Sequence, residues 1–289
     1  MTGAFDTVAV VDWSASAVPS PARPTADAIW IGTYGAAGAQ AVYLRTRTAA
    51  EAALAALIAA EQAAGRRLLI GFDFAMGYPV GFAKALTTQS TARAVWQWLA
   101  ATITDGPDNA NNRFAVAQRI NAMFPQAGPF WGRPGGLDLP DLPARKTVDY
   151  RVLGFAEKRR VEGLVPRAQP VWKLFTTGAV GSQALMGLPM IARLSARAGV
   201  TVWPFAPGGD VVLAEVYPSL IDPAVAVRVA RGEIKDRAQV RLLARSLHRL
   251  ARDGSLQAMM ADVPDGPERQ EEGWILGAGH SALLQEALA

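Results

Sequence analysis

The sequence predicts an α/β protein built on one mixed sheet. Apolar segments of strand length alternate with longer segments of helical character. The first of the apolar segments, Val8–Val11, is a continuous run, which is typical of a strand buried on both faces. An alanine-rich helix follows the third strand and leads into a fourth, and a helical crossover of this kind joins parallel strands. We therefore expect one α/β domain over residues 1–289.

The first half of the sheet can be assigned in chain order. The first strand ends at Asp12, and strands at 27–34 and 40–45 form an antiparallel meander around Gly35 and Gly38. Thr48 and Glu51 have the spacing of a capping box, which predicts a helix that closes near residue 65. The fourth strand, 67–73, is then the natural parallel neighbour of the first.

The segment from about 78 to 178 has a different character. It contains predicted helices and a stretch rich in proline and glycine, and a loop of that length is usually functional or disordered. We interpret it as an insertion or cap on one end of the sheet. The remaining predicted elements are helices at 91–103, 112–123 and 182–198, a short strand at 200–204, a strand at 211–217, an arginine-rich helix at 235–253, and one or two helices within 270–288.

Composition excludes several classes of protein. The chain contains no cysteine, which excludes thiol nucleophiles, disulfides and thiolate metal sites. It has no apolar run of about 18 residues or more, so we expect no membrane span. The N-terminus shows no secretory signal, and we expect a cytoplasmic protein. Only two histidines occur, both on predicted C-terminal helices, which argues against a histidine-centred triad or zinc site.

Acidic residues stand at or near the ends of three predicted strands. They are Asp12, Asp73 and Glu215. Any one of them alone is more typical of a turn or a helix cap, but three in one sheet favour a site for divalent metal ions. Magnesium and manganese prefer carboxylate oxygens, so Mg²⁺ or Mn²⁺ is the expected cofactor.

The connectivity strand, strand, strand, helix, strand, helix, strand, helix is that of the ribonuclease H-like fold. The segments Val11–Ser14, Ile70–Pro79 and Ala214–Pro218 resemble those of an uncharacterised family of predicted nucleases with this fold. The resemblance implies a mixed five-stranded sheet with flanking helices. It also implies a fourth acid, because Glu271-Glu272 is similar to the family's helical acid pair, with Glu in place of Asp.

The resemblance implies a metal-dependent phosphodiester hydrolase. Its catalytic acids would be Asp12, Asp73, Glu215 and Glu272, and the first three would bind metal. Two ions about 3.5–4 Å apart would activate water and stabilise the leaving oxygen. Some relatives of this type carry the label of molybdopterin guanine dinucleotide synthesis proteins, which implies instead a non-catalytic accessory protein that binds a nucleotide or cofactor. An actin-like ATPase or kinase is a further alternative, against which no second phosphate-binding half is found.

A second candidate site lies between Val171 and Gln183. Small and hydroxyl residues precede a predicted helix there, so backbone N–H groups could hold an anion with help from Lys173. The residues proposed to bind a cofactor are Lys173, Thr177, Gly178, Gly181 and Ser182. The alternative is an ordinary loop with a serine cap on the helix.

The expected partner is a nucleotide or a nucleic acid. For a polynucleotide, the basic run Lys158-Arg159-Arg160 would contact phosphates without reading sequence. For a mononucleotide or cofactor, Lys173 would matter more. Trp131, Trp172 and Trp203 could stack on bases, although core packing is the more typical role of such residues.

Overall fold

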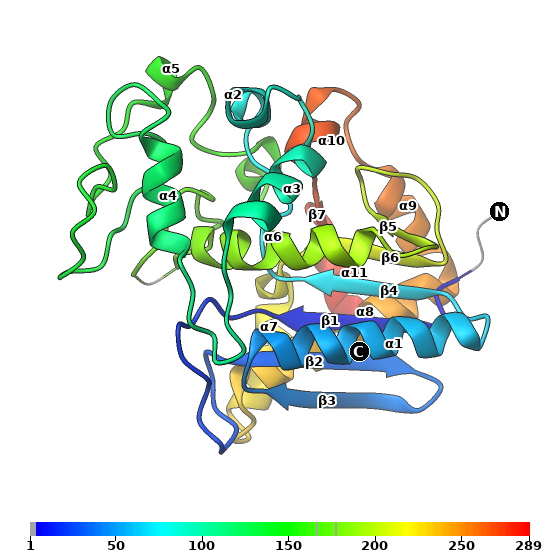
Figure 1. The fold of residues 1–289 in the computed structure, drawn as a ribbon. Coiled ribbons are helices and arrows are strands. Elements are labelled where there is room, and N and C mark those ends of the chain that lie inside the picture. The colour runs from blue at the N-terminus through cyan, green and yellow to red at the C-terminus, as the bar shows by residue number, and fades with distance from the viewer. Residues whose placement is uncertain (1–3, 166, 177) are drawn as a thin grey trace.

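The computed structural model describes residues 4–165, 167–176 and 178–289 of the chain. Its centre is a mixed sheet of seven strands in the order β3-β2-β1-β4-β6-β5, with β7 paired to β6 (Figure 1). The strands are β1 (Thr7–Asp12), β2 (Ile29–Gly35), β3 (Gly38–Leu44), β4 (Leu68–Phe72), β5 (Val200–Val202), β6 (Val211–Val216) and β7 (Ile275–Leu276). The predicted α/β class is confirmed, but the count of five strands was wrong, because the short strands β5 and β7 extend the sheet beside β6.

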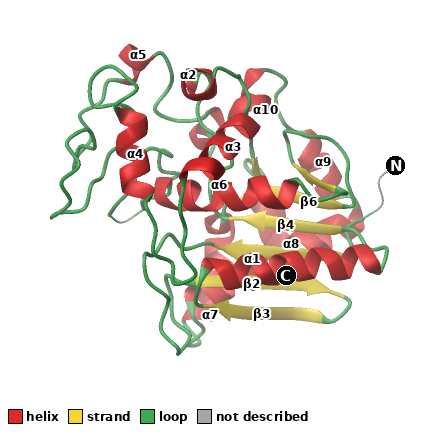
Figure 2. Ribbon diagram, viewed as in Figure 1, coloured by secondary structure: helices red, strands yellow, loops and turns green. Residues whose placement is uncertain are grey.

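Strand β1 lies at the centre of this sheet. It pairs antiparallel with β2, and β2 pairs antiparallel with β3, which confirms the expected meander. On its other side β1 pairs parallel with β4, and β4 pairs parallel with β6. In register, Phe72 of β4 stands opposite Val11 of β1 and opposite Glu215 of β6. The carboxyl ends of the three parallel strands therefore meet at one edge, where loops and helices gather (Figure 2).

Helices cover both faces of the sheet. Leu54 and Ile58 of α1 and Leu188 of α6 pack into the core on one face. On the other face α8 lies against β1 and β2, with Leu243 among the buried residues (Figure 1). The α-helices are α1 (Arg47–Ala63), α2 (Phe82–Thr87), α3 (Ala92–Thr102), α4 (Arg113–Asn121), α5 (Tyr150–Leu153), α6 (Gly181–Ser195), α7 (Asp222–Val229), α8 (Lys235–Asp253), α9 (Ser255–Ala261), α10 (Pro267–Glu271) and α11 (Ser281–Glu286), with short 3-10 turns η1 (Arg160–Gly163) and η2 (Pro218–Ile221).

The start of α1 differs from the expected capping box. The N-cap is Thr46, whose extended backbone lets its hydroxyl accept a hydrogen bond from the N–H of Ala49 at 3.2 Å. Thr48 is already inside the helix, and Glu51 forms a bidentate ion pair with Arg193 instead. Only Thr48 is followed by a glutamate at the spacing of a capping box, but it is Thr46 that has the non-helical backbone that a cap requires.

The segment between β4 and α6 packs on its own aromatic cluster. Trp172 is fully buried and contacts Tyr78, Phe82, Phe130 and Phe155. Trp172 therefore has the core-packing role, which was the more typical expectation, and its burial leaves no ring face for base stacking. Within the proline-rich stretch, the side-chain amide of Asn121 donates to the carbonyls of residues 130 and 141, which ties the loop down. Among the described residues, no helix is long and apolar enough to cross a membrane.

Candidate functional site

Two carboxyl groups meet at the carboxyl ends of β1 and β4. Asp12 is the last residue of β1, and Asp73 directly follows β4. The two side chains lie within hydrogen-bonding reach of each other, and Oδ1 of Asp73 accepts the backbone N–H of Trp13 at 2.8 Å. The parallel register brings them together, because Val11 and Phe72, the residues before them, are partners. We call Asp12 and Asp73 the acid pair.

The acid pair holds protons more tightly than ordinary carboxyls do. Burial raises the pKa of Asp73 to about 7, and the charge of Asp236 adds to this effect. Burial also raises the pKa of Asp12 well above its usual range, and the neighbouring charge of Asp73 raises it further. Two carboxylates this close cannot both ionise without cost. Near neutral pH the pair therefore retains a proton unless a cation neutralises it.

A third acid near the pair comes from a helix that was not assigned to the site from the sequence. Asp236 lies in the first turn of α8, and its charge raises the pKa of both members of the acid pair. Its Oδ2 accepts the N–H of Asp27 at 2.6 Å, which fixes the carboxylate. Burial raises the pKa of Asp236 as well. An acid in the first turn of a helix also complements the helix dipole, so its sequence position gave no separate signal.

Glu215 has a different environment from the acid pair. Alternate residues of a strand face opposite sides of a sheet, and Glu215 stands in register with Phe72 rather than with Asp73. Its carboxylate is only 4% exposed and binds the guanidinium of Arg159 in bidentate geometry, at 2.6 and 2.7 Å. Oε2 also accepts the N–H of Met76 at 3.0 Å. The structure thus gives this predicted metal ligand a buried arginine as its partner.

Glu272 and its neighbour Glu271 are also engaged with protein groups. Glu272 accepts the N–H of Val80 at 3.1 Å and the N–H of Arg160 at 2.7 Å, one on each carboxylate oxygen. Glu271 accepts the N–H of Gly81 at 3.0 Å. Both glutamates hold the turn that follows β4. The predicted fourth acid is therefore placed as an acceptor for backbone amides.

The carboxyl edge of the sheet opens into a cavity of about 470 Å³. Asp12 and Asp236 form part of its wall, and Arg113 is the cationic residue of that wall. The other residues that line it are Trp13, Ser14, Ala15, Ser16, Asp27, Leu174, Phe175, Thr176, Ala179, Ser182 and Gln183. Asp73 borders a separate small cavity of about 40 Å³ together with Arg159 and Glu215. We call the larger space the carboxyl-edge cavity.

The second predicted site contributes in part to this cavity. Ser182 lines it, and its hydroxyl donates to the carbonyl of Leu174 at 2.6 Å. Gly181 begins α6, where a side chain would collide with the carbonyl oxygen of Val171. Gly178 adopts a left-handed conformation with φ of 76°, and Lys173 places its ammonium over the ring of Trp131 at 5.8 Å. Thr177 lies outside the described residues.

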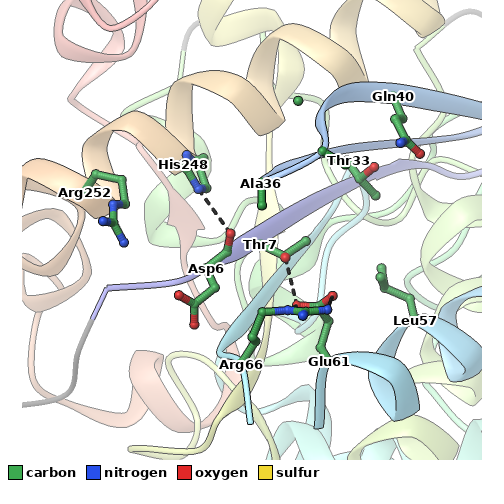
Figure 3. Close-up of a pocket in the computed structure, with 13 residues that line it drawn as sticks. Asp6, Thr7, Thr33, Ala36, Gln40, Leu57, Glu61, Arg66, His248 and Arg252 are labelled. Carbon is green, nitrogen blue, oxygen red and sulfur yellow. Dashed lines mark hydrogen bonds and ion pairs between the residues drawn. The ribbon is translucent and has the colours of Figure 1, made fainter. Parts of the chain in front are cut away.

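Another cavity, of about 580 Å³, lies beside the first residues of β1, at the opposite end of that strand from Asp12, and is drawn in Figure 3. Its wall includes His248 and Arg252 of α8, and Glu61 faces Arg66 on the other side. Glu61 is bound by Arg66 in bidentate geometry and by the hydroxyl of Thr7, and the bond from Arg66 lowers its pKa. The carboxylate of Glu61 is thus already neutralised by Arg66. No such partner among the described residues neutralises the acids at the carboxyl-edge cavity, and we therefore assign the functional site to that cavity.

The basic run does not form the expected phosphate-binding surface. Arg159 is only 2% exposed and is held by Glu215 and Glu162, while Nζ of Lys158 donates to the carbonyl of Ala168. Arg160 keeps an exposed side chain near Glu268. For a polynucleotide substrate, all three residues were predicted to contact phosphates, but Arg159 is not accessible for such a contact because buried carboxylates bind it.

Within the part of the chain that the structure describes, no group of three or more histidine, aspartate or glutamate side chains is arranged to hold a metal ion. Comparison with protein-family models, with curated proteins and with solved structures found no match to this chain. The function must therefore be argued from the geometry of the site.

Proposed function

We propose that the protein is a metal-dependent phosphodiester hydrolase whose metal site is the acid pair. One observation carries the proposal: Asp12 and Asp73 bring two carboxyls into contact at adjoining strand ends, with a third acid, Asp236, close by. The order β3-β2-β1-β4-β6 supports a ribonuclease H-like arrangement, in which acids at the ends of the first and fourth strands serve this chemistry.

The donor atoms of the acid pair are of the type that magnesium and manganese ions prefer. All candidate ligands are carboxylate oxygens, which these ions prefer. Magnesium usually binds through one or two carboxylates and completes its shell with water and substrate phosphate. A site with two contacting carboxylates therefore suffices, although no set of three is arranged as a ligand group in the described residues.

The charge of the site suits one ion better than two. Two ions were expected from a set of acids that included Glu215, and the guanidinium of Arg159 occupies both oxygens of that carboxylate. An ion at the acid pair would lower the pKa of a bound water and neutralise the phosphodiester. Asp236 adds negative charge beside the pair, and the N–H of Asp27 fixes its orientation. Glu215 and Arg159 hold the backbone at Met76, just after Asp73.

A non-catalytic role in binding a nucleotide or cofactor is the second candidate. The neutralised Glu215 favours it, because the site then offers fewer free carboxylates than the predicted four. Such a protein would bind its ligand in the carboxyl-edge cavity without cleaving it. The cavity volume of about 470 Å³ lies within the usual range for small-molecule sites.

Metal-induced thermal stabilisation tests the proposal independently of activity. We expect Mn²⁺ and Mg²⁺ to raise the melting temperature of the wild-type protein, and the variants Asp12→Asn and Asp73→Asn to lose this response. Asp138→Asn is the matched control, since Asp138 is exposed and makes no hydrogen bond or ion pair with another described residue. Hydrolysis of bis(p-nitrophenyl) phosphate should follow the same pattern. Stabilisation without hydrolysis would favour the binding role, and no metal response in the wild type would refute the metal-dependent hydrolase.

A further inference from the structure

Arg113 stands in the wall of the carboxyl-edge cavity without a carboxylate partner. Its Nε donates to Oγ of Ser182 at 3.1 Å and its Nη1 donates to Oδ1 of Asn111 at 2.7 Å. Both acceptors are neutral, and Arg113 forms no ion pair with a described residue. Asp105, whose charge acts on Arg113, already has both of its oxygens bound by Arg47 at 2.6 Å. Arg113 therefore has no carboxylate bound to it among the described residues.

The guanidinium of Arg113 has the properties of an anion-binding group: it is charged, partly dehydrated and held in place. Burial lowers the pKa of Arg113 to about 10, and the charge of Arg47 contributes to this decrease. The side chain is still charged at neutral pH, but it has lost much of its hydration. It also packs over the ring of Phe114 at 4.3 Å, which fixes its plane. An arginine held in this way binds phosphate or carboxylate well, because its donors are already oriented.

A chain of contacts connects Arg113 to the acid pair. Ser182, which accepts from Arg113, precedes Gln183 in the first turn of α6. The side-chain amide of Gln183 donates to the carbonyl of Trp13 at 2.6 Å, and the N–H of Trp13 donates to Asp73. A phosphate ester bound to Arg113 would thus lie in the cavity that Asp12 lines, and Asp73 lies behind Asp12 in the acid pair. The hydroxyls of Ser14 and Ser16 line the same space.

The cavity also has an apolar wall. Leu174, Phe175, Ala15 and Ala179 form part of its lining, and the ring of Phe175 is 46% exposed. An exposed aromatic ring beside a phosphate site offers a surface on which a planar base can stack. The volume of about 470 Å³ suits a small molecule. The basic run that would extend such a site along a polymer is instead turned inward at Arg159.

We propose that Arg113 binds the anionic phosphate of a small nucleotide phosphodiester, with the base against Phe175, and that a mononucleotide such as AMP, which corresponds to its hydrolysis product, binds in the same way. This inference rests on the proposed function for the identity of the site, since it names the substrate class of the same cavity. Binding through Arg113 does not itself require a metal. It can therefore be measured in EDTA, where failure of the metal site has no effect on the result.

Calorimetric titration of the metal-free protein with AMP and with adenosine tests the proposal. The wild type should bind AMP at least about tenfold more tightly than adenosine, because a hydrogen-bonded charge pair is lost without the phosphate. Arg113→Gln should weaken AMP binding by about 10- to 100-fold and leave adenosine binding unchanged. Arg113→Lys should retain part of the AMP affinity, since it keeps the charge but not the fork of donors.

Arg119→Gln is the matched control for this experiment. Arg119 lies on the same helix, α4, but is exposed, packs over Trp98 at 5.5 Å and does not line the cavity. This variant should bind AMP as the wild type does. Equal binding of AMP and adenosine by the wild type would overturn the proposal even if the Arg113 variants failed to fold. The proposal would be overturned in favour of a polynucleotide site if a short single-stranded oligonucleotide bound more tightly than AMP and Arg113→Gln did not weaken that binding. Absence of AMP binding by the wild type would also overturn it.

Discussion

Replacing Asp73 by asparagine should make the metal-free protein more stable at neutral pH. The carboxyl of Asp73 has its pKa raised from 3.8 to about 7, first by burial and then by the charge of Asp236. Between about pH 4 and pH 7 this carboxyl is therefore protonated in the folded protein, whereas it has lost its proton in the unfolded chain. Stability that depends on this group is fully present below about pH 4 and is lost as the pH rises to about 7.

The size of this effect follows from the shift in pKa. A change of one pKa unit corresponds to about 1.4 kcal/mol, so the free energy of unfolding should fall by about 4 kcal/mol across this range. Asparagine keeps an oxygen that can accept the N–H of Trp13, and it carries no charge to repel Asp12. Asp73→Asn should therefore gain up to about 4 kcal/mol at pH 8, or roughly 7 °C in melting temperature for a chain of this length.

Urea unfolding of the wild type and the variant between pH 4 and pH 8, in EDTA, measures this difference. The two proteins should have similar stability near pH 4 and should separate progressively toward pH 8. Asp138→Asn, which removes an exposed acid, should follow the wild type throughout. If the curves of the wild type and Asp73→Asn stay parallel over the whole range, Asp73 does not titrate as argued and the acid pair is not a site of charge repulsion.

Three further predictions concern other parts of the structure. Glu215→Gln should lower the free energy of unfolding by about 3–5 kcal/mol in urea, since Arg159 would be left as an uncompensated buried charge; a loss below about 1 kcal/mol would contradict the buried ion pair. Asp236→Asn should move the pH-dependent loss of stability to lower pH, because its charge no longer raises the pKa of the acid pair, and an unchanged midpoint would count against its proximity. Thr46→Ala should cost about 1 kcal/mol in thermal unfolding through loss of the cap, and Thr48→Ala should cost less; the reverse order would restore the original capping box.

The acid pair could be predicted from the sequence because the strands that carry it have unambiguous patterns. Val8–Val11 and the apolar residues before Asp73 each form a short continuous run, and the helix between them requires a parallel pair. Once two parallel strands are neighbours, residues at their carboxyl ends lie at the same edge of the sheet. The argument needs only the existence of the elements and no knowledge of side-chain partners.

The positions of Glu215 and Asp236 required information that the sequence does not contain. A shift of one residue in register moves a side chain to the other face of a sheet. Because Glu215 pairs with Phe72 and not with Asp73, its side chain points to the opposite face from that of Asp73. Asp236 reaches the acid pair because α8 packs across β1 and β2, a contact between segments more than two hundred residues apart in the chain. Neither register nor helix docking leaves a local pattern of residues.

The glutamates that resemble metal ligands explain how the acid pair is held in spite of its repulsion. The backbone after β4 donates to them in order: Met76 to Glu215, Val80 to Glu272 and Gly81 to Glu271. Arg159 neutralises the first of these carboxylates and also donates to the carbonyl of Glu272. These bonds fix the backbone of the turn beyond Asp73, and the N–H of Trp13 holds the Asp73 carboxyl beside Asp12. The acids near the strand ends thus divide into two groups, one that bears the unfavourable charge and one that holds the backbone against it.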